Sequence, residues 1–330
     1  MQQRLIEMTK LPATELRVKQ KIKASQVAKT VLSRVVHPKH VVQAIQLQRN
    51  RKRASRSLED VQLKLFSQVL PSDFLHFGFF ENPDIAPEDM TLNSVVEAQT
   101  RYAHLLLDLI EDRDSPVMDV GCGMGGLCRM LLERGQSPIA VTPDRVQVKN
   151  IQEKYPSVPV IGSKFEQIDA SQYEQMFGTV ITSESLQYLK LDKALPLLNR
   201  ILKKGGKWIA CDFFYREPTH EKSCHVWKEF VSKVEAEGWA ITFQRDITAH
   251  AAPTLRFVHM WATRFGIPLM HFAFHKFQKK QPGLHHLLHD ALQSLESLAN
   301  HGIGLIDPAA FVSKHQYMLL TLERAESNRV

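Results

Sequence analysis

One segment limits the fold more than any other: a strand-like apolar run is joined through a glycine-rich turn to a helix-like apolar run. It extends from Val117 to Leu132, with glycines at 121, 123 and 125. Glycine lets the backbone turn sharply and approach a ligand, because no Cβ stands in the way. The first N–H groups of the following helix attract a negatively charged group. The segment therefore predicts a strand–turn–helix unit with a ligand at its turn.

The chain around this unit alternates between short apolar strands and helical segments such as Gly125–Arg134 and Asp144–Lys154. Strands are expected near residues 117–121, 139–142, 158–162, 179–183, 207–213, 239–245 and 316–322. Alternation of this kind specifies a parallel sheet that is covered on both faces. We expect an α/β fold with a Rossmann-like, seven-stranded, mostly parallel sheet, helices on both faces, an N-terminal helical arm and a C-terminal helical cap.

The domain division follows from the same change of pattern. Residues 1–60 are predicted to form a basic helical extension, and residues 61–330 the main domain with its core at 100–215. The helical cap, at about 248–305, is inserted before the last strand. A cap in that position is expected over the carboxyl ends of the other strands, where ligands bind in open α/β sheets.

The positive charge of the chain is concentrated in its N-terminal arm. Residues 1–56 contain fourteen Lys or Arg and two acids, whereas the whole chain has a net charge of +7. Such an arm suits anionic lipid, nucleic acid, an anionic substrate or the acidic face of a partner subunit, and a solvated helix is the plain alternative. A nucleic-acid-modifying protein and a homodimer both remain open at this point.

Several classes of protein are disfavoured by the sequence. An apolar run of about 18 residues, which a membrane-spanning helix needs, does not occur. The first residues lack the apolar core of a secretory signal. The four cysteines show no paired spacing, which favours a reduced, cytoplasmic protein. No metal site is expected.

The nature of the ligand is indicated by Asp119, two residues before the first glycine. A carboxylate in that strand can pair with the ammonium group of an amino-acid-like ligand, and the pyrophosphate of NAD has no such group. An NAD-dependent oxidoreductase on the same unit is the alternative, because Gly121–Gly126 fits the dinucleotide fingerprint loosely.

With these motifs in view, the chain resembles the class I S-adenosylmethionine methyltransferases, and within them the tocopherol, sterol and cyclopropane-fatty-acid branch of small-molecule enzymes. The resemblance is carried by Asp119–Gly126, by Val141–Gln147 after the second strand, by Ser183–Tyr188 after the fourth, by Leu202–Lys207, and by the aromatic loop His76–Phe80. It implies S-adenosylmethionine as cofactor. The residues that it assigns to the cofactor are Asp119, Gly121, Cys122, Gly123, Gly125, Thr142, Gln147, Phe165, Ser183 and Phe77.

The candidate catalytic residues are Glu184 and Tyr188, just beyond a core strand, and His76 in the loop expected to cover the cofactor. A sulfonium methyl group is already activated, so the protein must align the acceptor, exclude water and remove a proton where needed. The Phe-rich loop and the apolar helical insertion favour a small lipophilic acceptor. An isoprenoid, a polyketide or a lipid-like intermediate, methylated at carbon or oxygen as in secondary metabolism, is the expected partner.

Overall fold

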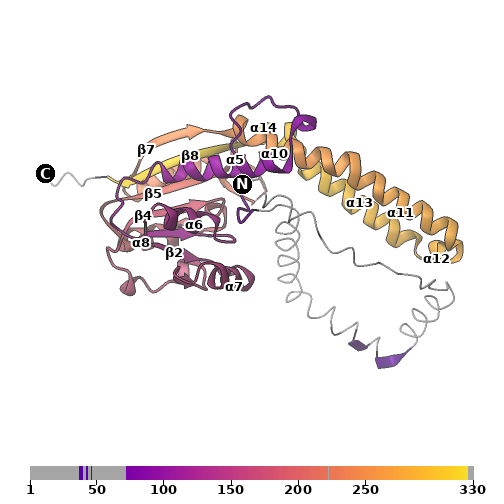
Figure 1. Cartoon of the computed structure of the whole chain (residues 1–330), viewed down its shortest axis with the longest axis horizontal. Coiled ribbons are helices and arrows are strands. Elements are labelled where there is room, and N and C mark those ends of the chain that lie inside the picture. Colours follow the sequence, from indigo (N-terminus) through magenta and orange to yellow (C-terminus); the bar gives the residue numbers. More distant parts are fainter. Residues whose placement is uncertain (1–36, 40–41, 44–45, 47–71, 222, 326–330) are drawn as a thin grey trace, which may run out of the picture.

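The computed structural model describes residues 37–39, 42–43, 46, 72–221 and 223–325. The predicted N-terminal extension lies almost wholly outside these residues, so its helices and its partners stay predictions. Within the described part, the chain forms one twisted sheet with helices on both faces and a long helical hairpin that projects from one end (Figure 1).

The strands run in the order β3-β2-β1-β4-β5-β8-β7, and β6 pairs with β5 outside this path. They are β1 (Val117–Val120), β2 (Pro138–Val141), β3 (Val160–Ile161), β4 (Phe177–Ser183), β5 (Leu202–Tyr215), β6 (His225–Val226), β7 (Trp239–Asp246) and β8 (His315–Arg324). The first five are parallel, and β8 is antiparallel to both β5 and β7. The predicted fold class is confirmed, and the two-residue strand β6 is the addition to it.

The longer helices that connect the strands are α5 (Leu92–Leu107), α6 (Gly126–Glu133), α7 (Arg145–Lys154), α8 (Leu191–Ile201), α9 (Trp227–Ala236) and α10 (Thr248–Trp261). The last part holds α11 (Ile267–Lys280), α12 (Pro282–Leu287), α13 (His289–Leu305) and α14 (Pro308–Lys314). Short 3-10 turns are η1 (Pro87–Asp89), η2 (Phe165–Gln167), η3 (Ala170–Gln172) and η4 (Leu186–Tyr188), and η5 (Ala262–Gly266) is a π-turn between α10 and α11.

The core is divided by the sheet, because successive side chains of a strand point to opposite faces. In β5, Trp208 and Ala210 pack with α8 and α9, whereas Ile209 and Cys211 pack with α5, α6 and α10. All four side chains are fully buried. Strands buried on both faces are therefore continuous apolar runs, as the sequence has them.

The order of the strands fixes where a ligand can bind. From β1 the chain moves outward through β2 and β3, and it then returns to β4 on the other side of β1. The crevice at the carboxyl ends of β1 and β4 lies at this reversal, which is the usual ligand position in open α/β sheets. The glycine turn follows β1 there, and Glu184 follows β4.

Candidate active site

The glycine turn after β1 has a backbone that other residues cannot adopt easily. Gly121, Gly123 and Gly125 have φ angles of 78°, 55° and 93°, all in the left-handed region. Space is restricted as well, because a Cβ on Gly121 would lie 2.3 Å from the Cβ of Ser185. Gly125 caps the start of α6. The turn therefore requires glycine for its conformation and for its contact with the loop after β4.

Asp119 lies directly behind this turn and is 1% exposed. Its carboxylate accepts a hydrogen bond from the Sγ of Cys128 on α6, 3.3 Å away. Burial raises the pKa of Asp119 to about 7, and this weak thiol donor lowers it only in part. Among the described residues no cationic side chain pairs with Asp119, so the cost of burying its negative charge is poorly compensated. A cationic ligand group at the turn would compensate it.

Glu184 follows β4 with a φ of 50°, which is rare for a residue with a side chain. Its carboxylate Oε1 accepts hydrogen bonds from the backbone N–H of Phe77, at 2.7 Å, and from the Oη of Tyr317, at 2.6 Å. Burial raises the pKa of Glu184 to about 7, while these two donors oppose the rise. A carboxyl group with this pKa exchanges protons readily near neutral pH. Strained backbone of this kind occurs preferentially at functional sites.

His76 lies between the rings of Phe74 and Tyr102, with centroid distances of 4.8 and 4.2 Å. Its Nδ1 is 2.8 Å from the carbonyl oxygen of Phe77. A carbonyl only accepts, so Nδ1 carries the proton and Nε2 presents a lone pair, which is buried and has no partner. Burial lowers the pKa of His76 to about 4. His76 is therefore a neutral hydrogen-bond acceptor rather than a strong base at neutral pH.

Four aromatic rings cluster around Tyr317, whose hydroxyl donates to Glu184. Phe213 stacks on Tyr317 with a centroid distance of 4.1 Å, and Phe77 meets Phe213 edge-on at 5.1 Å. Tyr102 lies 5.9 Å from Tyr317, and its Oη is hydrogen-bonded to the Oγ of Ser183 at 3.0 Å. Burial raises the pKa of both tyrosines well above its usual value, so both stay protonated donors. The rings exclude water and present apolar faces.

A third buried carboxylate, Asp212, lies on β5 beside the loop after β4. It accepts hydrogen bonds from the backbone N–H groups of Gln187, at 3.0 Å, and Phe213, at 2.8 Å. Burial raises the pKa of Asp212 to about 7. Sequence reasoning missed Asp212, Phe213, Tyr102 and Tyr317. An acid inside an otherwise apolar strand was the available signal for Asp212, and Tyr317 carried none.

The other residues assigned to the cofactor lie around the same edge of the sheet. The Oγ1 of Thr142 donates to the Oε1 of Gln147 at 2.5 Å, at the end of β2 and the start of α7. Cys122, in the turn, and Phe165, on η2, are buried. Their contacts with a cofactor stay predictions, as do those of Ser183 and Phe77.

The structure separates one catalytic candidate from the others. Glu184 and His76 both contact the backbone of Phe77, through its N–H and its carbonyl group respectively. Tyr188, on η4, is instead 76% exposed. Its role stays a prediction, and Tyr317 is the tyrosine that the structure brings to Glu184.

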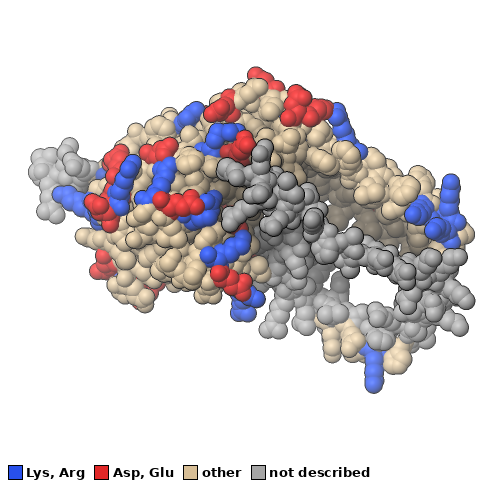
Figure 2. All heavy atoms as spheres, in the orientation of Figure 1, with Lys and Arg blue, Asp and Glu red and all other residues tan. Residues whose placement is uncertain are grey.

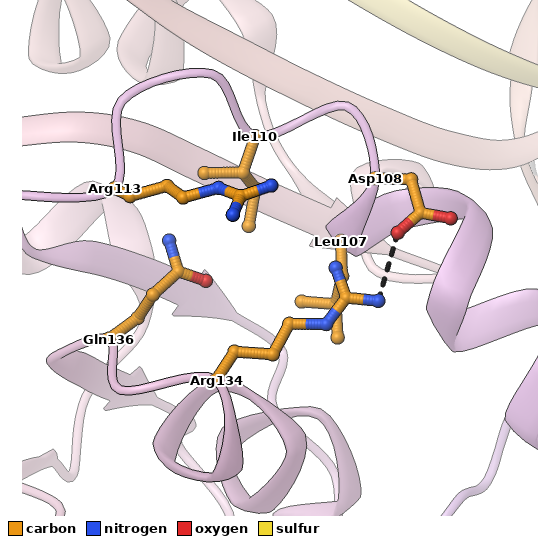
Figure 3. A pocket seen from close by; sticks show the side chains of 6 residues that line it. All are labelled: Leu107, Asp108, Ile110, Arg113, Arg134 and Gln136. Atoms are coloured by element: carbon orange, nitrogen blue, oxygen red, sulfur yellow. Dashed lines mark hydrogen bonds and ion pairs between the residues drawn. The ribbon is translucent and has the colours of Figure 1, made fainter.

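A pocket of about 390 Å³ lies elsewhere, among Leu107, Asp108, Ile110, Arg113, Arg134 and Gln136 (Figure 3). These residues precede the first residues of β1 and β2, so the pocket is at the amino ends of the strands. Arg134 is held there by Asp108, with 2.9 Å between Nη2 and Oδ1. The glycine turn is at the opposite edge of the sheet, and the pocket is therefore separate from the candidate active site.

Comparison with known proteins gives the family of the core. Residues 118–210 match the model of a family described as a methyltransferase domain. This chain contains a methyltransferase domain. The matched residues extend from β1 to the middle of β5, and they include the glycine turn and Glu184. The class I methyltransferase recognised in the sequence is thereby confirmed for this part of the chain.

Relatives of the methyltransferase domain include two curated proteins. One is an uncharacterized methyltransferase of Exiguobacterium sibiricum, 28% identical over 119 residues, which are 36% of this chain and 56% of that protein. The other is a 2-methyl-6-phytyl-1,4-hydroquinone methyltransferase of Synechocystis sp., 26% identical over 179 residues, which are 51% and 53% of the two chains. The chain thus spans about half the length of the curated relatives that it matches.

Among solved structures, the chain resembles a geranyl diphosphate C-methyltransferase from Streptomyces coelicolor, in complex with Mg²⁺, geranyl-S-thiolodiphosphate and S-adenosyl-L-homocysteine. The TM-score is 0.54 with 16% identity, over 76% of this chain and 88% of that chain. At this identity the likeness concerns the fold. Together with the domain match, it supports S-adenosylmethionine as the cofactor expected from the sequence.

The residues present also fit this cofactor. S-Adenosylmethionine carries a sulfonium and an ammonium group, and Asp119, Glu184 and Asp212 are buried carboxylates at one edge of the sheet, each with a raised pKa. Cations at this edge would stabilise their ionised forms. The left-handed glycines give close access to the backbone at the same place.

Proposed function

We propose that this chain transfers the methyl group of S-adenosylmethionine to a carbon or an oxygen of a small lipophilic acceptor. The observation that carries the proposal is the meeting of a left-handed glycine turn with three buried, incompletely compensated carboxylates at the reversal point of the sheet. Bound there, the cofactor would supply an activated methyl group. Asp119 and the glycine turn would hold its amino-acid end.

The acceptor class is inferred from the groups around Glu184. The rings of Phe77, Phe213 and Tyr317 offer apolar faces, and these exclude water from the reacting atoms. Oε1 of Glu184 is occupied by its two donors, which leaves Oε2 to accept a proton from a hydroxyl acceptor. For an alkene carbon, the same carboxylate and rings would stabilise positive charge that develops on the acceptor. An isoprenoid, polyketide or lipid-like molecule suits both cases.

Glu184 is better matched than His76 to the role of base. A base works best when its pKa is close to the working pH. The pKa of Glu184 is raised to about 7, whereas that of His76 is lowered to about 4. We infer that Glu184 takes the proton, and that Nε2 of His76 orients the acceptor through a hydrogen bond.

The experiment is an assay with methyl-labelled S-adenosylmethionine and a panel of acceptors: a prenylated hydroquinone, an isoprenyl diphosphate, a phenolic polyketide and bulk RNA. We expect methylation of at least one lipophilic acceptor, with the modified atom located by NMR. Glu184→Gln should lose this activity and still bind S-adenosylhomocysteine. Methylation of RNA alone would contradict the acceptor class.

The cellular location of the protein is inferred from its cysteines. Cys122, Cys128, Cys211 and Cys224 are all unpaired thiols, a state that the reducing cytoplasm maintains. We propose a cytoplasmic protein. Among the described residues, the structure contains no helix that is long and apolar enough to cross a membrane.

A further inference from the structure

The structure carries an unusual apolar surface far from the candidate active site. Ten of the sixteen exposed large apolar side chains among the described residues lie between Val258 and Leu305. Most of this stretch is α11, η5 and α13, and none of α11, α12 or α13 contributes a buried residue. Residues 261–305 are called the distal hairpin below. It projects from the sheet as two long antiparallel helices joined at their far end (Figure 1).

The exposed side chains of the distal hairpin follow helical spacing. Trp261, Phe265, Leu269 and Phe272 are separated by four, four and three residues, so they form a stripe along α10, η5 and α11. Leu269 and Phe272 expose 67% and 60% of their surface, and Trp261 stacks on Phe265 at 4.5 Å. A second stripe runs along α13.

The members of the second stripe are Leu288, Leu295, Leu298 and Leu305. The two helices meet through another face, where Nε2 of His271 is 2.9 Å from Oε1 of Glu296. Both stripes therefore lie outside the contact between the helices. Contiguous apolar surface of this extent on a folded protein marks an interaction site.

The far end of the distal hairpin is basic. Lys276, Lys279 and Lys280 lie in the C-terminal part of α11. Figure 2 shows blue side chains at the far end of the hairpin and no red ones beside them on the face shown. The Nζ of Lys276 lies 5.5 Å from the centroid of the Phe272 ring, so an apolar stripe passes directly into a cationic end. Aromatic and Leu side chains followed by lysines are the composition of helices that lie in the interface of an anionic bilayer.

We propose that the distal hairpin docks onto a membrane surface that contains anionic lipid. The apolar stripe enters the region between headgroups and acyl chains, and the lysines contact lipid phosphates. This docking depends on the hairpin alone and not on the reaction proposed above.

The test uses the full chain and the fluorescence of Trp261. Of the four tryptophans, Trp208 and Trp239 are buried, Trp227 is partly buried and Trp261 is 46% exposed. On addition of vesicles of phosphatidylcholine mixed with phosphatidylserine, we expect the emission to shift to shorter wavelength and the protein to sediment with the vesicles. Trp261→Phe should abolish most of the shift and retain most of the sedimentation. Vesicles of phosphatidylcholine alone should bind more weakly.

Two sets of variants separate the apolar and the cationic contributions. Leu269→Ser with Phe272→Ser should weaken partition about tenfold or more, whereas the matched pair Leu92→Ser with Phe243→Ser, at exposed positions outside the hairpin, should not. The triple variant Lys276→Gln, Lys279→Gln and Lys280→Gln should weaken partition onto anionic vesicles about tenfold. The control is the triple variant Lys149→Gln, Lys193→Gln and Lys228→Gln, at exposed positions outside the hairpin.

Each alternative outcome has a distinct signature. Absence of sedimentation with anionic vesicles overturns the proposal. So does a dimer, detected by light scattering without lipid, that Leu269→Ser with Phe272→Ser converts to a monomer, because the stripe would then be a subunit interface. Circular dichroism of each variant, matched to the unaltered chain, verifies that the fold is retained.

Discussion

Gly121→Ala should destabilise the protein far more than the same substitution at Gly238. Both glycines have a φ of 78°, so alanine suffers the same left-handed strain, about 1–2 kcal/mol, at either position. At Gly238 a Cβ would have no atom within 4 Å, whereas at Gly121 it would lie 2.3 Å from the Cβ of Ser185. Relief of that overlap costs about 1–3 kcal/mol more. We expect the free energy of unfolding to fall by about 1–2 kcal/mol in Gly238→Ala and by about 2–5 kcal/mol in Gly121→Ala.

The assay is urea unfolding of the two variants, with calorimetric titration of S-adenosylhomocysteine. Only Gly121→Ala should weaken the binding, because the displaced turn is the one next to Asp119. Ser185→Gly removes the overlapping Cβ, so the double variant with Gly121→Ala should recover part of the loss relative to the sum of the single variants. Equal losses at Gly121 and Gly238, or strict additivity in the double variant, would refute the close packing of turn and loop.

Three further predictions concern the buried carboxylates. In a pH–rate profile, kcat should rise with pH around a midpoint near 7, and Glu184→Gln should remove this rise and lower kcat about 100-fold or more. Tyr317→Phe should move the midpoint to higher pH, because the hydrogen bond from the Tyr317 hydroxyl lowers the pKa of Glu184. Binding of S-adenosylmethionine should weaken as the pH falls below about 7, where Asp119 becomes protonated, and Asp119→Asn should flatten this dependence in calorimetric titrations. The pKa of Asp212 in the folded protein is raised from 3.8 to about 7, so the contribution of Asp212 to stability declines as the pH rises through that range. The midpoint of urea unfolding should therefore decline less with pH in Asp212→Asn than in the unaltered chain.

The position of the glycine turn was predictable because its determinants are local. Glycines at 121, 123 and 125 are needed for backbone angles that few other residues adopt, and the strand before them is apolar because both of its faces are buried. The strands near 139, 179 and 207 were found for the same reason. β5 begins earlier than expected, at Leu202, because Leu202 already pairs with Phe177. The register then shifts before Lys207 pairs with Thr179, so Lys203–Gly206 is an irregular part of the strand.

The surroundings of Glu184 depend on contacts that are distant in sequence. Tyr317 is separated from Glu184 by more than a hundred residues, and the antiparallel pairing of β8 with β5 brings it there. Nothing in the residues around Tyr317 indicates that its hydroxyl meets a carboxylate. Tyr188 was the nearer candidate in the sequence, but the 3-10 turn η4 leaves its ring largely exposed.

The helices between β7 and β8 illustrate a further limit of sequence patterns. Their length and apolar content predicted a cap, and α10 does pack on β8 and on the segment that ends in Phe80. The distal hairpin instead extends away from the sheet (Figure 1). Apolar residues at helical spacing indicate that one face of a helix will be covered, but they do not indicate which element or partner covers it. The domain limits proposed from the sequence therefore stay predictions.

Calorimetric titration of the full chain with S-adenosylhomocysteine and with NAD tests the central claim most directly. We expect micromolar binding of S-adenosylhomocysteine, at least tenfold weaker binding in Asp119→Asn, and no heat of binding from NAD. Binding of NAD together with no detectable binding of S-adenosylhomocysteine would contradict the proposed cofactor.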